Sequence, residues 1–239
     1  MIDRPSPNHD ARPQGQAVDI LVLHYTDMAS AEAALARMTD AAAQVSAHYC
    51  IDEDGTVYRL VPEERRAWHA GVSYWAGARD INARSIGIEL VNPGHSCGYR
   101  PFPEAQMQAL ADLARGILAR HPIPAHRVLG HSDVAPARKI DPGELFDWQW
   151  LARAGVGLWP QALGFPDPGP ARNAHDIADT QSKLGRFGYG IAVTGILDPS
   201  TRQTLSAFQR HFRPACFDGR PDGETRRRLA ALIAAVPQL

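Results

Sequence analysis

The sequence predicts an α/β fold in which a mixed central β-sheet is flanked by helices, followed by a small C-terminal domain of three helices. In the first two thirds of the chain, short apolar runs rich in branched side chains alternate with amphipathic patterns of helical period. A proline-rich stretch interrupts both patterns, and only helical periodicity follows it. With 239 residues, the chain can hold one domain of ordinary size and a second, smaller one.

Two of the predicted strands end at histidines. Residues 19–23 are an apolar run typical of a buried strand, and His24 follows at its C-terminal end. Residues 127–130 form another short strand, whose end delivers His131. If these strands are neighbours, about 4.8 Å apart, their terminal side chains can reach one ion. This adjacency is an assumption that the structure has to test.

A hairpin and a longer strand complete the predicted sheet. Residues 47–51 and 56–60 flank Gly55, which supplies the positive φ of a tight reversal. In residues 85–91, alternation with a period of two places three apolar side chains on one face and Glu89 on the opposite face.

The predicted helices have an apolar stripe, and several have a polar cap or a proline in the first turn. They cover residues 31–38, 103–121, 144–153, 174–186, 199–212 and 222–236. We therefore divide the chain into an N-terminal extension (1–17), a main α/β domain (18–158), a Pro/Gly-rich linker (159–172) and a helical domain (173–239).

Composition argues against several classes of protein. A formal net charge of -1 gives no electrostatic reason to bind nucleic acid. No apolar stretch approaches the ~20 residues of a membrane span. The first residues lack the apolar region of a secretory signal, which favours the cytoplasm. No heptad pattern predicts an oligomeric state.

Cys50, Cys97 and Cys216 are widely spaced and odd in number, so we expect free thiols, without an assigned role.

His24, His131 and Asp141 are the residue types of a catalytic zinc site, which takes three protein ligands and keeps a fourth position for water. The chain has no HExxH motif, so such a site must be assembled from separate segments. Without further context, a strand-end histidine is more often a hydrogen-bonded structural residue. Likewise, Glu89 and Lys139 are more often a solvated carboxylate and a surface lysine.

Five segments supply that context. Residues 128–143, VLGHSDVAPARKIDPG, resemble the second metal segment of the type 2 N-acetylmuramoyl-L-alanine amidases. LVLHYT (21–26), SAHY (46–49), WHAG (68–71) and NARSIGIEL (82–90) are similar to the other segments of that family, in the same order. Chance agreement at all five segments is improbable.

The resemblance implies one zinc ion held by His24, His131 and Asp141, with Glu89 as the catalytic carboxylate and Lys139 beside the reacting carbonyl. A bound zinc ion lowers the pKa of water from about 15.7 to about 7 and polarises an amide oxygen. The implied reaction cuts the amide between the lactyl group of N-acetylmuramic acid, or its 1,6-anhydro form, and L-alanine of the stem peptide, in peptidoglycan turnover or recycling.

Four further residues from the matched segments are expected near the substrate: His48, Trp68, His69 and Asn82. None of these is the preferred metal ligand. Replacement of Asp141 by His69 in the ligand set would still leave a legitimate three-histidine zinc site.

The tail resembles a peptidoglycan-binding domain, with DTQSKLGRFGY (179–189), Phe208-Gln-Arg210 and Asp218-Gly219 as its marks. The expected partner is therefore peptidoglycan or a muropeptide, and such a tail favours the periplasm over the cytoplasm. Two other functions stay open. One is a non-catalytic receptor of peptidoglycan fragments, since some relatives of the family, among the peptidoglycan recognition proteins, lack a ligand. The other is a zinc peptidase that cuts within the stem peptide.

Overall fold

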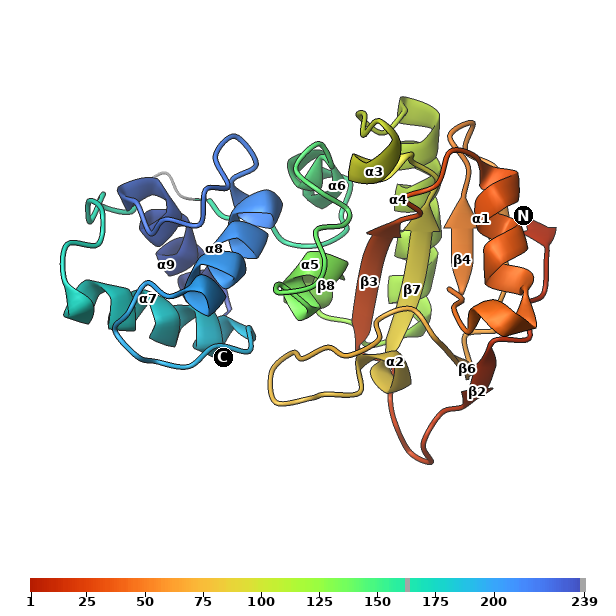
Figure 1. The fold of residues 1–239 in the computed structure, drawn as a ribbon, viewed down its shortest axis with the longest axis horizontal. Coiled ribbons are helices and arrows are strands. Elements are labelled where there is room, and N and C mark those ends of the chain that lie inside the picture. The colour runs from red at the N-terminus through yellow and green to blue at the C-terminus, as the bar shows by residue number, and fades with distance from the viewer. Residues whose placement is uncertain (162–163, 237–239) are drawn as a thin grey trace.

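The structure, a computed structural model, describes residues 1–161 and 164–236 (Figure 1). Its central sheet contains β1 (Ile2–Asp3), β3 (Ile20–Tyr25), β4 (Tyr49–Ile51), β5 (Val57–Arg59), β7 (Ser85–Leu90) and β8 (Val128–Gly130). Their order across the sheet is β1-β5-β4-β7-β3-β8. β3 is parallel to both β7 and β8, while β4 and β5 form the predicted antiparallel hairpin, so the sheet is mixed. The strands that deliver His24 and His131 are therefore neighbours.

Alternation along the strands gives the sheet two different faces. Leu21 and Leu23 of β3 pack into one core, and the three apolar residues of β7 join them as predicted. His24 and Glu89 are out of phase with these residues and lie on the opposite face. The side chains of His24 and Glu89 thus project away from the core that packs on the first face.

Helices cover both faces of the sheet. α4 (Glu104–Arg120) and α6 (Trp148–Arg153) pack against the first face, where Leu110 of α4 is fully buried. α1 (Ala31–Thr39) lies on the other face, and the side chain of Ser30 caps its first turn. Short helical segments link these elements: η1 (Ala41–Ala43), α2 (Ile81–Arg84), α3 (Gly94–Cys97), η2 (Ala125–Arg127) and α5 (His131–Val134).

The helix predicted over residues 144–153 is shorter than expected. It begins at Trp148, because the Asp147 side chain accepts a hydrogen bond from the backbone N–H of Trp150 and caps the helix there. The residues before it form turns, in which the N–H of Leu145 donates to the hydroxyl of Tyr99.

Residues 1–17, predicted as an extension, are packed onto the main domain. β1 adds to the edge of the sheet beside β5, and β2 (His9–Ala11) pairs with β6 (Arg65–Ala67) in a separate antiparallel ribbon. The Arg12 guanidinium then donates to the backbone carbonyls of Glu63, Asn82, Ala83 and Ser85. Local periodicity could not predict these contacts, because each joins residues that are far apart in the chain.

The C-terminal domain consists of α7 (Ala174–Phe187), α8 (Pro199–Phe212) and α9 (Gly223–Ala235), as predicted. It lies beside the β8 edge of the sheet (Figure 1). Its apolar residues share one core with the second face of the sheet, where Val22 and Leu184 both belong to the same buried cluster. Within the described ranges, no helix is long and apolar enough to cross a membrane.

Candidate metal centre and active-site pocket

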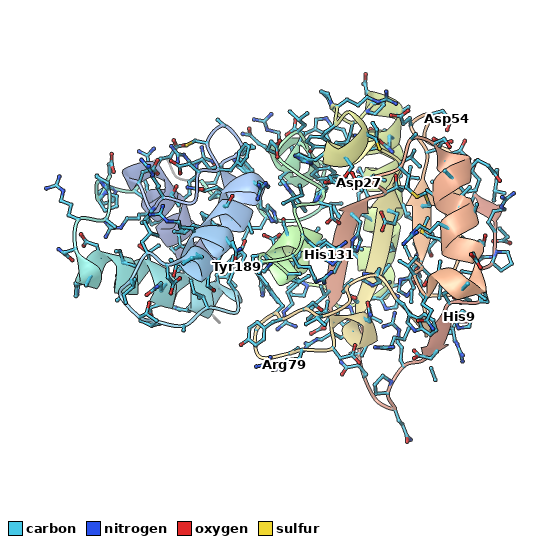
Figure 2. All side chains as sticks on the ribbon, in the orientation of Figure 1. His9, Asp27, Asp54, Arg79, His131 and Tyr189 are labelled. Carbon is cyan, nitrogen blue, oxygen red and sulfur yellow. The ribbon has the colours of Figure 1, made fainter. Side chains whose placement is uncertain are left out.

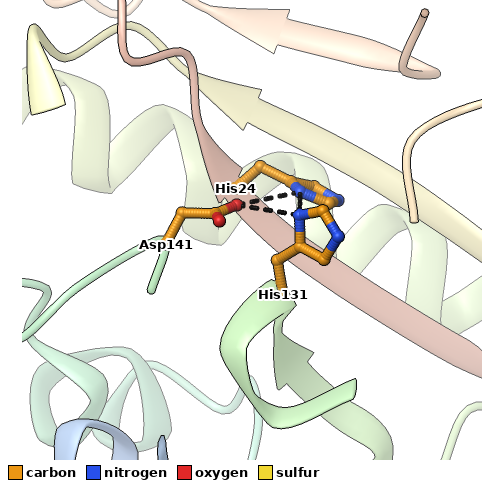
Figure 3. A group of neighbouring side chains, drawn as sticks. All are labelled: His24, His131 and Asp141. Carbon is orange, nitrogen blue, oxygen red and sulfur yellow. Dashed lines mark hydrogen bonds and ion pairs between the residues drawn. The ribbon is translucent and has the colours of Figure 1, made fainter. Parts of the chain in front are cut away.

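His24, His131 and Asp141 converge on one point at the C-terminal ends of the parallel strands (Figure 3). The two Nδ1 atoms lie 2.9 Å apart, and Asp141 Oδ2 lies 3.1 Å from each of them. All three side chains are buried. The predicted ligand set is thus brought together from three distant segments.

The local backbone explains this convergence. His24 is near the end of β3, and Gly130 of the neighbouring β8 pairs with Leu23, so His131 emerges one position further on. Asp141 returns to the same place after a turn, where its backbone carbonyl accepts the N–H of Ser132. A Cβ on Gly130 would lie 2.8 Å from the Pro142 ring, so the close return of this segment requires a glycine.

In each of the two histidines, the contact of the outer ring nitrogen, Nε2, determines which ring nitrogen carries the proton. His131 Nε2 lies 3.1 Å from the carbonyl oxygen of Ala70, so it must donate a proton to that oxygen. In neutral His131, the Nδ1 atom is then unprotonated and has a free lone pair.

The same argument applies to His24 through a chain of three groups. The Ser85 hydroxyl donates to the Ile81 carbonyl and accepts from His69 Nε2 at 3.1 Å, which leaves His69 Nδ1 as an acceptor. His24 Nε2 lies 3.0 Å from that acceptor and must donate to it. His24 Nδ1 is therefore also an unprotonated lone pair.

Two imidazole lone pairs and a carboxylate oxygen thus face one another at about 3 Å in a buried place. Burial, and then His131, lower the pKa of His24 to about 4, so protonation of His24 does not relieve the repulsion at neutral pH. Burial opposes ionisation of Asp141, but the two histidines still hold the pKa of its carboxyl below the usual value. A bound cation is the group that fits this donor set.

Glu89 lies beside the metal centre and lines the same pocket of ≈ 340 Å³. Its Oε2 atom is buried and has no hydrogen-bond partner among the described residues. Burial, and then the neighbouring Asp141 carboxylate, raise the pKa of Glu89 well above its usual value. A carboxylate oxygen buried without a partner is costly, which marks a site under functional constraint.

Lys139 lines the pocket as well, and its charge acts on both Glu89 and His24. The adjacent Arg138 is a pocket residue that sequence reasoning missed. Its guanidinium donates to the carbonyl of Ala70 at 2.7 Å, the same oxygen that receives the proton of His131. The signal for Arg138 was present in the matched segment 128–143, but its partner lies in another part of the chain.

The four predicted substrate contacts have different surroundings. His69 lines the pocket, but it bonds to the outer nitrogen of His24 and does not join the ligand set. His48 is fully buried and accepts the N–H of Gly87, and Asn82 accepts the N–H groups of His69 and Ala70. The side chains of His48, Asn82 and Trp68 do not line this pocket. Their contact with substrate stays a prediction.

Three converging ligand atoms beside an open pocket are typical of a catalytic zinc site and not of a closed structural one. Fold and site together define a hydrolase whose active-site pocket contains a cluster that could hold a metal ion. The family described as N-acetylmuramoyl-L-alanine amidase matches residues 14–144, and the putative peptidoglycan binding domain matches residues 173–229. The chain belongs to the N-acetylmuramoyl-L-alanine amidase family, which confirms the resemblance found in the sequence.

Similar proteins span nearly the whole chain. The N-acetylmuramoyl-L-alanine amidase AmiD of Escherichia coli (strain K12) is 40% identical over 252 residues, which cover 98% of this chain and 90% of AmiD. The structure of AmiD with the substrate anhydro-N-acetylmuramic acid-L-Ala-D-gamma-Glu-L-Lys has a TM-score of 0.83 at 37% identity, covering 95% of this chain and 93% of that one. The structure of AMPDH3 from Pseudomonas aeruginosa has a TM-score of 0.78 at 35% identity, covering 94% of this chain and 95% of that one.

Proposed function

We propose that this amidase uses one zinc ion, held by His24, His131 and Asp141, to cut the amide between the lactyl group of N-acetylmuramic acid and L-alanine. The observation that carries the proposal is the convergence of three lone pairs beside the unpartnered carboxylate of Glu89. The substrate named for the AmiD complex contains this same amide, in the 1,6-anhydro form of the sugar.

The donor set supports zinc as the ion. Two neutral imidazoles and one carboxylate form a mixed nitrogen and oxygen set of the kind that zinc accepts. When bound, zinc supplies a Lewis acid that lowers the pKa of water and polarises an amide carbonyl. His69 and the Ala70 carbonyl keep the outer nitrogens of the two histidines protonated, which directs both lone pairs to the ion.

Glu89 is proposed to carry the proton. Its carboxylate faces the pocket next to the metal centre, so it can accept a proton from the attacking water. The raised pKa of the carboxyl then favours retention of that proton until the amine of L-alanine leaves. Delivery of the proton to that nitrogen makes the amine a good leaving group.

Lys139 is proposed to stabilise the charge that develops on the carbonyl oxygen. Lys139 lines the pocket, and its charge acts electrostatically on both Glu89 and His24, which locates it near the reacting centre. By comparison with oxyanion donors in other hydrolases, this interaction contributes about 3 kcal/mol to the transition state. A neutral side chain of similar length cannot supply it.

Mass spectrometry of muropeptides tests the proposed reaction. The purified zinc-loaded protein is incubated with N-acetylmuramyl tripeptide and with its 1,6-anhydro form, and with both after removal of zinc by a chelator. We expect free tripeptide with L-alanine at its amino terminus, only in the zinc-loaded samples. Unchanged muropeptides would indicate a receptor, and cleavage between amino acids would indicate a peptidase; either outcome contradicts the proposal.

A further inference from the structure

The segment between His131 and Asp141 carries two of the three metal ligands, and the C-terminal domain contacts it at both ends. Near the first end, Asp133 lies two residues after His131 in α5. Just beyond the second end, Glu144 lies three residues after Asp141. Both of these carboxylates face side chains of α8.

Asp133 is fully buried and accepts three hydrogen bonds. One comes from within the segment, where the N–H of Gly130 donates to Oδ2 at 2.8 Å. The other two come from the C-terminal domain: the Tyr189 hydroxyl donates to Oδ1 at 2.5 Å, and His211 Nδ1 lies 2.7 Å from Oδ2. Asp133 therefore connects the backbone on either side of His131 to two residues of the other domain.

The two donors are themselves fixed by packing. The His211 ring stacks on Trp148 with centroids 3.7 Å apart, and the Tyr189 ring packs against Trp75 at 4.9 Å. Figure 2 shows Tyr189 and His131 at the junction of the two domains. On the same helix as His211, Arg210 forms an ion pair with Glu144 at 3.6 Å. The position of α8 relative to the ligand segment is thus determined at two points.

We propose that Tyr189 and His211 of the C-terminal domain are positioning residues for the metal centre, acting through Asp133 on His131. Loss of either donor leaves a buried carboxylate short of one partner, so the turn that holds Asp133 must shift to regain one. Because Asp133 also holds the N–H of Gly130, the shift moves the backbone that carries His131. The domain that matches peptidoglycan-binding modules is, on this account, a structural part of the metal site. This inference rests on the zinc centre of the proposed function.

The test compares zinc affinities, measured by competition with a chromogenic chelator, among full-length variants. Tyr189→Phe and His211→Phe each remove one donor and keep an aromatic ring. His211→Asn keeps a donor at the position of Nδ1 but loses the stacked ring. Groups that orient metal ligands change affinity by ~10–100-fold, and these groups act one step further away, so we expect a loss of about 10-fold for the two phenylalanine variants. His211→Asn is expected to retain most of the affinity.

A variant of the same domain that does not touch Asp133 is the matched control. Gln181 is buried in α7 and bonds to Thr194, Ile196 and Thr201, so Gln181→Leu weakens the C-terminal domain by itself. We expect it to bind zinc like the wild type. In cobalt-substituted protein, the visible absorption band should change in Tyr189→Phe and His211→Phe and stay unchanged in Gln181→Leu.

The possible outcomes are distinguishable. Wild-type zinc affinity and an unchanged cobalt spectrum in both phenylalanine variants would overturn the inference and leave the zinc centre intact. An equal loss in Gln181→Leu would also overturn it, because the effect would then be general destabilisation. A wild-type chain that binds no zinc would overturn the metal centre itself. Tyr189→Phe and His211→Phe probe the same carboxylate independently, so a folding defect in one leaves the other to decide.

Discussion

His24 and Glu89 are direct partners in the register of two adjacent parallel strands, β3 and β7. Adjacent strands are about 4.8 Å apart, and both side chains point to the same face, so the proposed metal ligand and the proposed proton carrier lie side by side. A shift of the register by one residue would turn Glu89 into the opposite core. The geometry of the reaction therefore depends on the pairing of one residue in each strand.

Glu89→Gln should separate metal binding from turnover. The amide is nearly the same size but cannot accept a proton, so we expect zinc content to stay at the wild-type level while kcat/KM falls by about 100- to 10,000-fold. Release of tripeptide and zinc content are measured on the same preparation. Glu104→Gln, on the exposed first turn of α4, is the control and should have wild-type activity. Full turnover in Glu89→Gln would remove this residue from the reaction.

Gly87→Ala should weaken the metal centre from a distance. A Cβ at this position would lie 2.5 Å from Cγ of His69, so the His69 ring must move and give up its bond to His24. We expect a loss of zinc affinity of about 10- to 100-fold and a destabilisation of about 1–3 kcal/mol.

Gly116→Ala in α4 is the matched control for Gly87→Ala. Its new Cβ would meet only the flexible end of Arg120, at 3.2 Å, and alanine favours a helix by about 1 kcal/mol over glycine. This variant should bind zinc normally and be slightly more stable. Unaltered zinc affinity in Gly87→Ala would show that His69 does not orient His24.

Zinc should stabilise the wild-type fold, because the ion relieves the repulsion among three lone pairs. At a free zinc concentration of about 100 times the dissociation constant, we expect about 2.7 kcal/mol of added stability, seen as a higher unfolding temperature. Asp141→Asn removes the anionic ligand and should abolish most of this gain. Calorimetry with zinc and with a chelator measures both proteins; equal zinc-dependent shifts in the two would speak against the ligand set.

Glu63 predicts a pH dependence of stability away from the metal centre. Burial acts to raise the pKa of its carboxyl, but hydrogen bonds from Arg120, Tyr49 and His121 hold it at about 2 in the folded chain, against an ordinary value of 4.5. The carboxylate therefore stabilises the fold above pH 4.5, and this contribution is lost as the pH falls toward 2.

We expect Glu63→Gln to reduce the free energy of unfolding by about 1–2 kcal/mol at pH 7, after allowance for solvent screening of a partly buried group. The difference from the wild type should shrink as the pH is lowered below 4.5. Denaturant unfolding at a series of pH values measures it. A difference that is constant with pH would mean that the ionised carboxylate is not the source.

Several features of the site could be predicted from local sequence. Alternation alone located Glu89 on the face opposite the apolar residues of β7, and this is confirmed. The position of His131 directly after β8 followed from a short apolar run, as did that of His24 near the end of β3, although β3 continues to Tyr25, two residues beyond the predicted strand. Asp141 was a candidate by residue type, and the family resemblance assigned it as a ligand; no periodicity points to it.

Other features depend on contacts between distant segments, which no local pattern encodes. The chain of bonds from Ser85 through His69 to His24 joins three separate parts of the sequence. The hydrogen bonds from Tyr189 and His211 to Asp133 join residues 56 and 78 positions apart. Such contacts exist only after the sheet has formed and the two domains have packed together.

Anomalous diffraction at the zinc edge, from crystals grown with zinc, tests the central claim most directly. We predict one zinc peak about 2.0–2.2 Å from Nδ1 of His24, Nδ1 of His131 and a carboxylate oxygen of Asp141. A zinc ion bound through the outer nitrogens or through His69, or no peak among these three residues, would contradict the account.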